Sequence, residues 1–191
     1  MKFPLTIGSA IPGFNTPGAG LDEPFAMLDA CHERVERTLR LLARIVPYVT
    51  KYGIDAKAQS AAVDVLRYFD IAAPLHHGDE ELHVFPLLLQ QNYAATTRMV
   101  EQMLVDHEQM SAHWADLRPT LVELSADTPA EDVGGIVTEV FERQIAAFAA
   151  LYATHLETES RILFPAAARL KTDEALRHMS DDMRRRRAMP R

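Results

Sequence analysis

Four stretches of the chain repeat apolar side chains at alternating steps of three and four residues, which is the spacing of one buried helix face. They begin near residues 24, 55, 96 and 128 of the 191. No stretch shows the alternation of apolar and polar residues that is typical of a half-buried strand. Short connections between amphipathic helices favour antiparallel neighbours. The sequence therefore predicts an all-α fold, an up-down-up-down four-helix bundle.

Capping residues suggest where the first two helices begin and end. Asp22 is expected to cap the first helix, and Gly53 to end it. The second helix is expected over residues 55–91. Pro74 lies inside that helix and predicts a kink, because proline has no N–H to donate and its ring crowds the preceding turn.

The remaining helices are bounded in the same way. The third is expected over residues 96–124. Thr128 and Glu131 are spaced as a capping box at the start of the fourth. Thr172 is placed to cap a short final helix. No internal break in composition suggests a second folded domain within a chain of this length.

The two ends of the chain differ from the bundle. Residues 1–21 are rich in proline and glycine, and we expect an extended arm there. Residues 22–183 are expected to form the bundle with its short C-terminal helix. Residues 184–191 begin with four arginines and are expected to be a solvated basic tail.

Polar residues occupy the predicted apolar faces. Each of the four faces contains a histidine, and two contain a glutamate one turn later, on the same side of the helix. A lone core histidine is common, but an unpaired buried carboxylate costs several kcal/mol, so a partner must neutralise these groups. With a rise of about 1.5 Å per residue, all of them reach one level of the bundle. These residues are His32, His76, Glu80, His107, His155 and Glu159.

An internal repeat relates the two His-Glu pairs. The segments "HHGDEELHVFPLLL" at 76–89 and "HLETESRILFPAAA" at 155–168 align without a gap. The helices before them echo each other more weakly, around His32 and His107. Two similar helical hairpins would build a nearly symmetric site. A symmetric site with two carboxylates suggests two metal ions that the carboxylates bridge.

With these motifs the chain resembles the hemerythrin family, in its bacterial HHE cation-binding branch. The resemblance covers roughly residues 22–183. It rests on the histidine of the first helix, H-x-x-x-E-E-x-x-x-F-P in the second, H-E in the third, and H-x-x-x-E followed by L-F-P in the fourth. It implies a non-haem di-iron centre with terminal histidine ligands, bridged by Glu80 and Glu159.

The chain departs from the family's oxygen carriers at one ligand. Those carriers have a fifth histidine one turn from the ligand of the third helix, where this chain has Met103 and Ser111. Two other histidines are candidates for a further ligand: His77, next to His76, and His83, one turn beyond Glu80 on the same expected face. The resemblance therefore leaves plain reversible oxygen carriage open to question.

Three other side chains near the expected ligands have less defined roles. Glu81 could support a ligand or face solvent, and Tyr152 could donate a hydrogen bond to the centre or only pack. Cys31 points away from the seam if His32 points into it, and no role is assigned to it.

The donor set indicates the metal and the range of functions. Imidazole and carboxylate ligands around a pair of octahedral ions suit iron, or less well manganese, whereas zinc prefers a smaller tetrahedral set. Four histidines and two glutamates leave coordination positions open. We therefore expect a binder or sensor of oxygen, nitric oxide or hydrogen peroxide. The alternatives are a peroxide-consuming or oxidase-type di-iron enzyme, an iron donor for repair of damaged iron centres, or a bundle with a structural metal.

Charge and composition exclude other classes. The formal net charge of −7 argues against a general nucleic-acid binder. A single cysteine allows neither an internal disulfide nor a thiolate metal cage. No apolar run is long enough to span a membrane and no secretory signal is recognisable, so a cytoplasmic location is expected. The oligomeric state is left open.

Overall fold

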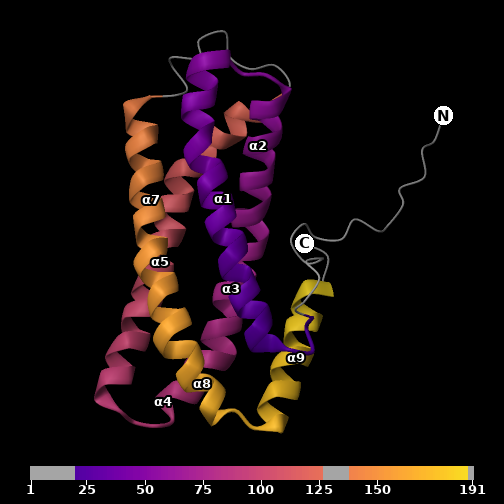
Figure 1. The fold of residues 1–191 in the computed structure, drawn as a ribbon, viewed down its shortest axis with the longest axis vertical. Helices are drawn as coiled ribbons and strands as arrows, with labels where there is room; N and C mark the ends of the chain where they lie inside the picture. Colours follow the sequence, from indigo (N-terminus) through magenta and orange to yellow (C-terminus); the bar gives the residue numbers. More distant parts are fainter. Residues whose placement is uncertain (1–19, 127–137, 189–191) are drawn as a thin grey trace, which may run out of the picture.

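The computed structural model describes residues 20–126 and 138–188, and within these ranges it is helical with no strand. Four long helical segments alternate in direction (Figure 1). Two of them are built from several consecutive elements. The elements are α1 Pro24–Tyr52; α2 Ala56–Arg67, η1 Tyr68–Ala72, α3 Ala73–Asp79, η2 Glu80–Val84 and α4 Phe85–Leu89; α5 Ala94–Leu124; α7 Glu139–Thr158, η3 Glu159–Leu163 and α8 Phe164–Leu170; and α9 Asp173–Ala188.

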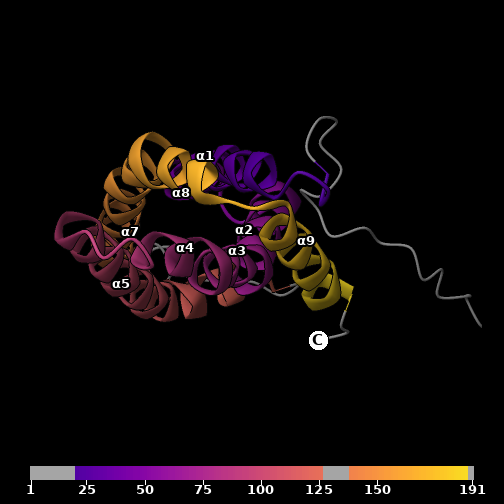
Figure 2. The ribbon, with the colours of Figure 1, turned by 90° about the horizontal axis from the view of Figure 1, so that it is seen from below.

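The four segments close into a ring. Helix α1 packs on α2 and α7, and α5 packs on the other side of the same two helices. Seen from below, α9 lies outside this ring (Figure 2). The predicted all-α, up-down-up-down bundle is confirmed.

The predicted helix ends are partly confirmed. The Asp55 side chain accepts hydrogen bonds from two backbone N–H groups at the start of α2. Gly53 has φ of 78°, and its N–H donates to the Val49 carbonyl at the end of α1. Thr172 accepts from the Ala175 N–H at the start of α9. The predicted Asp22 cap is wrong: α1 makes no side-chain cap hydrogen bond, and Asp22 pairs with Arg184 instead.

Three predicted features fall partly or wholly outside the described residues. Of the arm predicted for residues 1–21, residues 1–19 lie outside the described ranges. The predicted capping box of Thr128 and Glu131 also lies outside them. The solvated basic tail predicted for residues 184–191 is described only for residues 184–188, and there the prediction is wrong. Residues 184–188 continue helix α9, which is therefore longer than predicted.

Three π-helical turns interrupt the α-helices: η1, η2 and η3. Each ends two residues before a proline: Pro74, Pro86 and Pro165. In η2 the N–H of Phe85 donates to the Glu80 carbonyl, five residues back. A proline in a regular α-helix would crowd the carbonyl four residues before it, and a wider turn relieves that contact. The irregularity expected at Pro74 is thus a π turn just ahead of it.

Each π turn also changes which side chains face the core. One extra residue rotates all later positions by about 100°. A single α-helical period places His83 and Leu87 on the core face beyond Glu80, but the buried positions there are Val84 and Leu88. The same period places Ile162 on the core face beyond Glu159, but Leu163 is buried and Ile162 is 48% exposed. The core face expected from one period was therefore wrong after η2 and η3.

The apolar core consists of two separate clusters. One joins α1, α2, α5 and α7 and includes Val46, Leu121 and Phe148. The other lies at the α4 and α8 end, where α9 covers it with Met179 and Met183. The predicted polar residues belong to the helices between the two clusters, so the bundle has a polar layer inside it.

Helix α9 is held by a buried ion-pair cluster. Asp79 has no exposed surface and pairs with both Arg186 and Arg187. Asp182 of α9 pairs with Arg186 and accepts from His83 at 2.9 Å. These contacts explain why the predicted solvated tail instead packs against the bundle.

Replacing Asp79 with alanine should lower the free energy of unfolding by about 3 kcal/mol, because it leaves the guanidinium groups of Arg186 and Arg187 without their buried partner. Urea denaturation of the metal-free protein measures this change. Arg185→Ala is the control, since Arg185 is exposed on the same helix, and it should change stability by less than about 0.5 kcal/mol. Equal effects of the two substitutions would contradict the role given to Asp79.

Candidate metal centre

All six predicted ligands come together inside the bundle. They are buried, and both glutamates have no exposed surface. The ligand-type atoms form two overlapping groups in which every atom lies within 4.8 Å of the others. Each group contains two histidines and both glutamates. The first is His32, His76, Glu80 and Glu159, and the second is Glu80, His107, His155 and Glu159.

Each glutamate lies between histidines of two helices. Glu159 Oε2 is 3.1 Å from His32 Nε2, and Glu159 Oε1 is 3.0 Å from His155 Nε2. Glu80 is placed in the same way, 3.2 Å from His76 Nε2 and 3.5 Å from His107 Nε2. Both carboxylates thus reach into both groups, one oxygen toward each. This is the arrangement needed to bridge two ions.

Most of the inward-facing atoms make no hydrogen bond among the described residues, although His107 Nε2 and His155 Nε2 lie 3.2 Å apart. Both carboxylate oxygens of Glu80 and of Glu159 are buried without a hydrogen-bond partner among the described residues, as is Nε2 of His32 and of His76. Leaving so many buried polar atoms unpaired is costly. A cation at the centre of each group would satisfy them. The residues therefore fit a pair of bound metal ions.

Outer contacts orient three of the histidines. The Nδ1 of His107 lies 2.7 Å from Glu81 Oε1, and that of His155 lies 3.3 Å from Asp106 Oδ2. His32 Nδ1 lies 2.8 Å from the Ser160 hydroxyl. An Nδ1–H that donates outward leaves Nε2 unprotonated toward the centre, which is the form that binds metal.

Burial and mutual proximity set the ionisation of the metal-free site. Burial, with Glu159 beside it, raises the pKa of Glu80 well above its ordinary value. Burial opposes ionisation of Glu159 too, but His155 and His32 outweigh it and hold the pKa of Glu159 low. Burial lowers the pKa of His76. The cluster therefore favours one ionised carboxylate and a neutral imidazole at His76, which is ready to coordinate.

His77 also lies at the centre. Its ligand-type nitrogen lies within 4.8 Å of those of His107 and His155. Its ring stacks on His107 with centroids 4.0 Å apart, and burial lowers its pKa well below the ordinary value. His77 is therefore placed to add a third histidine to the second group only. Such a set would be asymmetric, with three histidines at one ion and two at the other.

His83, the other candidate, lies away from the centre. Its Nε2 pairs with Asp182 of α9, and its ring meets that of His178. It belongs to none of the ligand groups found among the described residues. The π turn η2 explains the difference, because the extra residue turns His83 off the face that carries Glu80.

The two histidines should respond differently to substitution. His77→Ala should weaken binding of the ion in the group of His107 and His155, typically by 10- to 100-fold for a supporting contact and more for a direct ligand. His83→Ala is the matched control and should leave metal content unchanged. Metal analysis after dialysis measures both. Loss of metal in His83→Ala alone would contradict the placement of these side chains.

Two supporting residues, Asp106 and Ser160, were not predicted from the sequence. Each is directly adjacent in sequence to a predicted ligand, as is Glu81. A polar residue beside a core histidine or glutamate lies about 100° around the helix, at the edge of the buried face. From that edge it can reach a histidine of the neighbouring helix. Their position next to a predicted ligand in the sequence is the signal that could have identified these supporting residues.

The fold and site define a helical-bundle protein whose core contains a cluster of His and Glu side chains able to hold metal. Residues 23–167 match the hemerythrin HHE cation binding domain. The chain belongs to this family, as its motifs suggested.

One curated relative is an uncharacterized protein of Haemophilus influenzae, 36% identical over 106 residues, which is 56% of this chain. The chain spans 61% of that relative's length. No helix in the described ranges is both long and apolar enough to cross a membrane.

Proposed function

We propose that the protein holds two iron ions at this centre and binds a small ligand there, such as oxygen, nitric oxide or hydrogen peroxide. The observation that carries the proposal is the sharing of Glu80 and Glu159 between two groups of histidines. Bridging carboxylates are characteristic of paired metal ions. Bound iron would supply exchangeable coordination positions and redox chemistry.

The donor chemistry supports iron. The groups contain only imidazole nitrogens and carboxylate oxygens, and the lone cysteine, Cys31, belongs to none of them. Such mixed N and O donors suit octahedral iron better than tetrahedral zinc. Counting His77, five histidines and two bridging glutamates still leave an octahedral pair incompletely coordinated.

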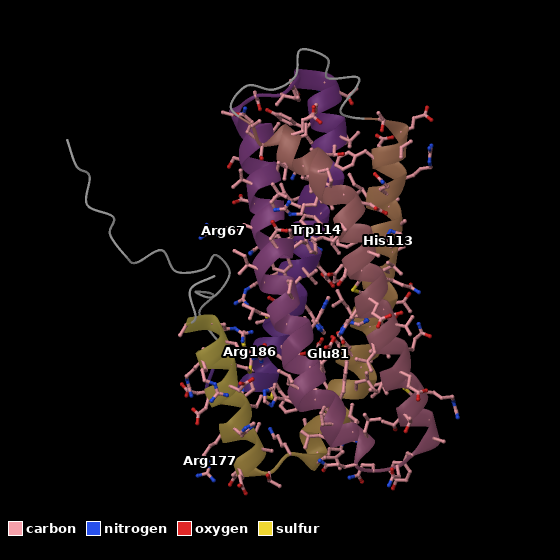
Figure 3. The ribbon with its side chains drawn as sticks, turned by 180° about the vertical axis from the view of Figure 1, so that it is seen from behind. Arg67, Glu81, His113, Trp114, Arg177 and Arg186 are labelled. Carbon is pink, nitrogen blue, oxygen red and sulfur yellow. The ribbon has the colours of Figure 1, made fainter. Side chains whose placement is uncertain are left out.

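A cavity gives small molecules access to one side of the centre. It has a volume of about 670 Å³ and reaches His77 and His107. Its walls include Phe69, Trp114 and Tyr152. In Figure 3 the labelled Trp114 and Glu81 lie along this side of the bundle. The aromatic part of this wall favours entry of small, weakly polar ligands. The buried Tyr152 lies within ring-contact distance of His77.

Metal analysis and rapid-mixing spectroscopy together test the proposal. Protein purified from iron-replete cells should contain about two irons per chain, the number that two bridging carboxylates serve. The reduced protein is then mixed with oxygen, nitric oxide or hydrogen peroxide, and the absorption of the iron pair is followed. A saturable spectral change with stoichiometric ligand supports a binder or sensor.

The same experiment distinguishes an enzyme or an iron donor from a binder or sensor. Continued consumption of peroxide or oxygen beyond stoichiometry would identify a peroxide-consuming or oxidase-type enzyme. Transfer of iron to an acceptor protein would identify an iron donor. A single zinc ion and no iron would contradict the di-iron proposal itself.

A further inference from the structure

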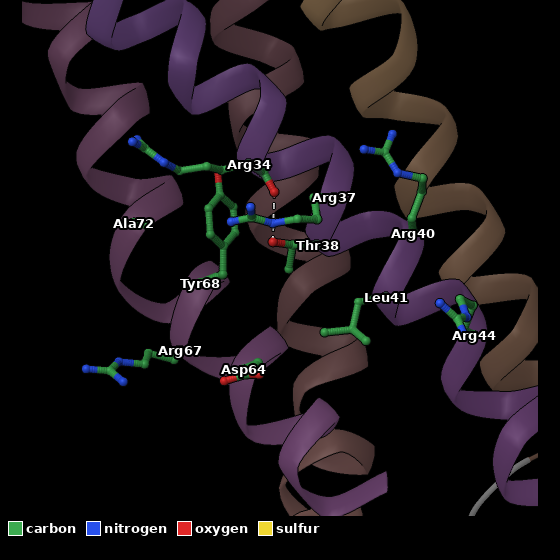
Figure 4. A pocket seen from close by; sticks show the side chains of 10 residues that line it. All are labelled: Arg34, Arg37, Thr38, Arg40, Leu41, Arg44, Asp64, Arg67, Tyr68 and Ala72. Atoms are coloured by element: carbon green, nitrogen blue, oxygen red, sulfur yellow. Dashed lines mark hydrogen bonds between the residues drawn. The ribbon is translucent and has the colours of Figure 1, made fainter. Parts of the chain in front are cut away.

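A second cavity, of about 550 Å³, lies between α1 and the helix formed by α2 and η1. Figure 4 shows its ten lining side chains, and none of them belongs to the His and Glu groups of the metal centre. Five of the ten are arginines, and one is an aspartate, Asp64. The arginines are Arg34, Arg37, Arg40, Arg44 and Arg67.

The helical spacing of α1 gathers these side chains on one side. Positions 34, 37, 41 and 44 follow one another at steps of three or four, so they share a face. Arg67 and Tyr68 face them from the end of α2 and the start of η1. In Figure 4, Arg40 and Arg44 lie on one side of Tyr68 and Arg67 lies on the other. The arginines thus come from both helices that line the cavity.

The local charge is opposite to that of the chain. The whole sequence has 27 acidic and 20 basic residues. Around the cavity, however, Arg40 is paired only with the exposed Glu36 beside it. Arg37, Arg44 and Arg67 form no ion pair with any residue in the described ranges. These four arginines are exposed around one cavity, where their like charges repel one another, and a bound anion would relieve the repulsion.

The side chains indicate the kind of anion. Guanidinium groups bind phosphate oxygens in a planar, two-pronged geometry, which a lysine cannot offer. The hydroxyl groups of Thr38 and Tyr68 already donate, to the carbonyls of Arg34 and Cys31. The arginines must therefore supply the donors. With five arginines and one aspartate, Asp64, the lining has an excess of positive charge. The cavity therefore favours an anion over a cation.

The size of the cavity indicates more than a lone phosphate. A volume of this magnitude falls within the range of small-molecule sites. The ring of Tyr68 with Leu41 and Ala72 adds apolar wall beside the arginines. An organic group attached to the phosphate could pack there.

We propose that this arginine-lined cavity binds a phosphate-bearing anion, either a soluble phosphorylated molecule or a phospholipid headgroup. The site is independent of which metal the centre holds. It is also independent of the ligand that the metal binds.

The test uses the full chain as purified, at low ionic strength. Calorimetric titrations with pyrophosphate and with ATP probe a soluble source. Co-sedimentation with phosphatidylcholine vesicles, with and without phosphatidic acid, probes a headgroup. The double variant Arg37→Gln, Arg67→Gln removes two of the unpaired arginines. Arg98→Gln, Arg143→Gln is the matched control, since it makes the same change of charge at exposed positions away from the cavity.

Binding should weaken by about tenfold or more for each arginine lost in the cavity variant, as expected for a charged hydrogen bond. The control should bind within about twofold of the unmodified chain, because Arg98 and Arg143 lie away from the cavity and cannot contact an anion bound there. Binding of ATP or pyrophosphate that follows this pattern supports a soluble ligand, and binding only to phosphatidic acid vesicles supports a headgroup. No binding in either arm overturns the proposal, and so does equal weakening in the control. Unchanged binding in both variants would also overturn the proposal, because the phosphate would then be bound elsewhere, as at the metal centre, which neither variant alters.

Discussion

Replacing Glu159 with alanine should remove at least one of the two irons and the charge-transfer absorption of the oxidised pair. Glu159 is fully buried, and its two oxygens lie 3.0 and 3.1 Å from histidines of two different helices. It belongs to both ligand groups. No other described carboxylate near the centre can replace it, because Glu80 already faces its own pair of histidines. Iron analysis and the visible spectrum of the variant measure the loss.

Glu157→Ala is the matched control for this experiment. Glu157 is on the same helix but exposed, where it pairs with Arg161. Its substitution should leave two irons and the spectrum unchanged. Two irons retained in Glu159→Ala would show that Glu159 does not bridge. Iron lost equally from both variants would show a general effect on the helix.

Removing the metal should lower the melting temperature of the protein by about 8 to 16 °C. A ligand that binds only the folded state, present at about a thousandfold above its Kd, adds about 4 kcal/mol. For a chain of this size each kcal/mol moves the midpoint by about 2 to 4 °C. The metal-free centre also leaves Glu80 and Glu159 facing each other in the core. Calorimetry of the iron-loaded and chelated proteins measures the difference.

The Glu159→Ala variant provides the control for chelation. If it binds less metal, its midpoint should move less when chelator is added. Equal midpoints for the loaded and chelated unmodified protein would show that metal binding is not linked to folding. That result would count against a buried centre.

Much of the fold followed from the sequence because each helix carries a regular apolar face. The buried positions predicted for α1, such as Leu28, His32 and Val35, are buried as expected. On α5 the same holds for Met103 and His107. The matching depth of the histidines and glutamates was sufficient to predict that they converge. Within its own helix, none of the six predicted ligands lies beyond the first residue of η2 or η3, although His76 and Glu80 follow η1.

The residues assigned to the wrong helix face have one physical cause in common. Beyond Glu80 and Glu159 a single helical period no longer holds, so His83 and Ile162 were placed on the wrong face. The signal was present in the repeated Phe-Pro pairs, Phe85-Pro86 and Phe164-Pro165. A proline that follows a ligand by six residues indicates a widened turn between them. The asymmetric position of His77 could not be predicted, because it depends on how α3 sits against α5.

The pairing of α9 with the bundle also could not be read from the sequence. Four consecutive arginines suggest a solvated tail. Only the structure shows that Asp79 is buried where Arg186 and Arg187 can reach it. Long-range ion pairs of this kind leave no periodic trace in a sequence.

The extra residue in η2 divides the helix of α3 and α4 into two segments, and the extra residue in η3 divides the helix of α7 and α8 in the same way. The segment before the glutamate and the segment after it differ by one residue in their helical register. In η2 the hydrogen bond from the Phe85 N–H to the Glu80 carbonyl lies where the two segments join. Deleting one residue just after either glutamate would remove the residue that the π turn accommodates and would give a continuous α-helix. Val84 and Leu88 would then lie three and seven residues after Glu80, which are core positions of a regular α-helix. This part of the chain could therefore lose one residue without turning its apolar face away from the core, and only the π turn would be lost.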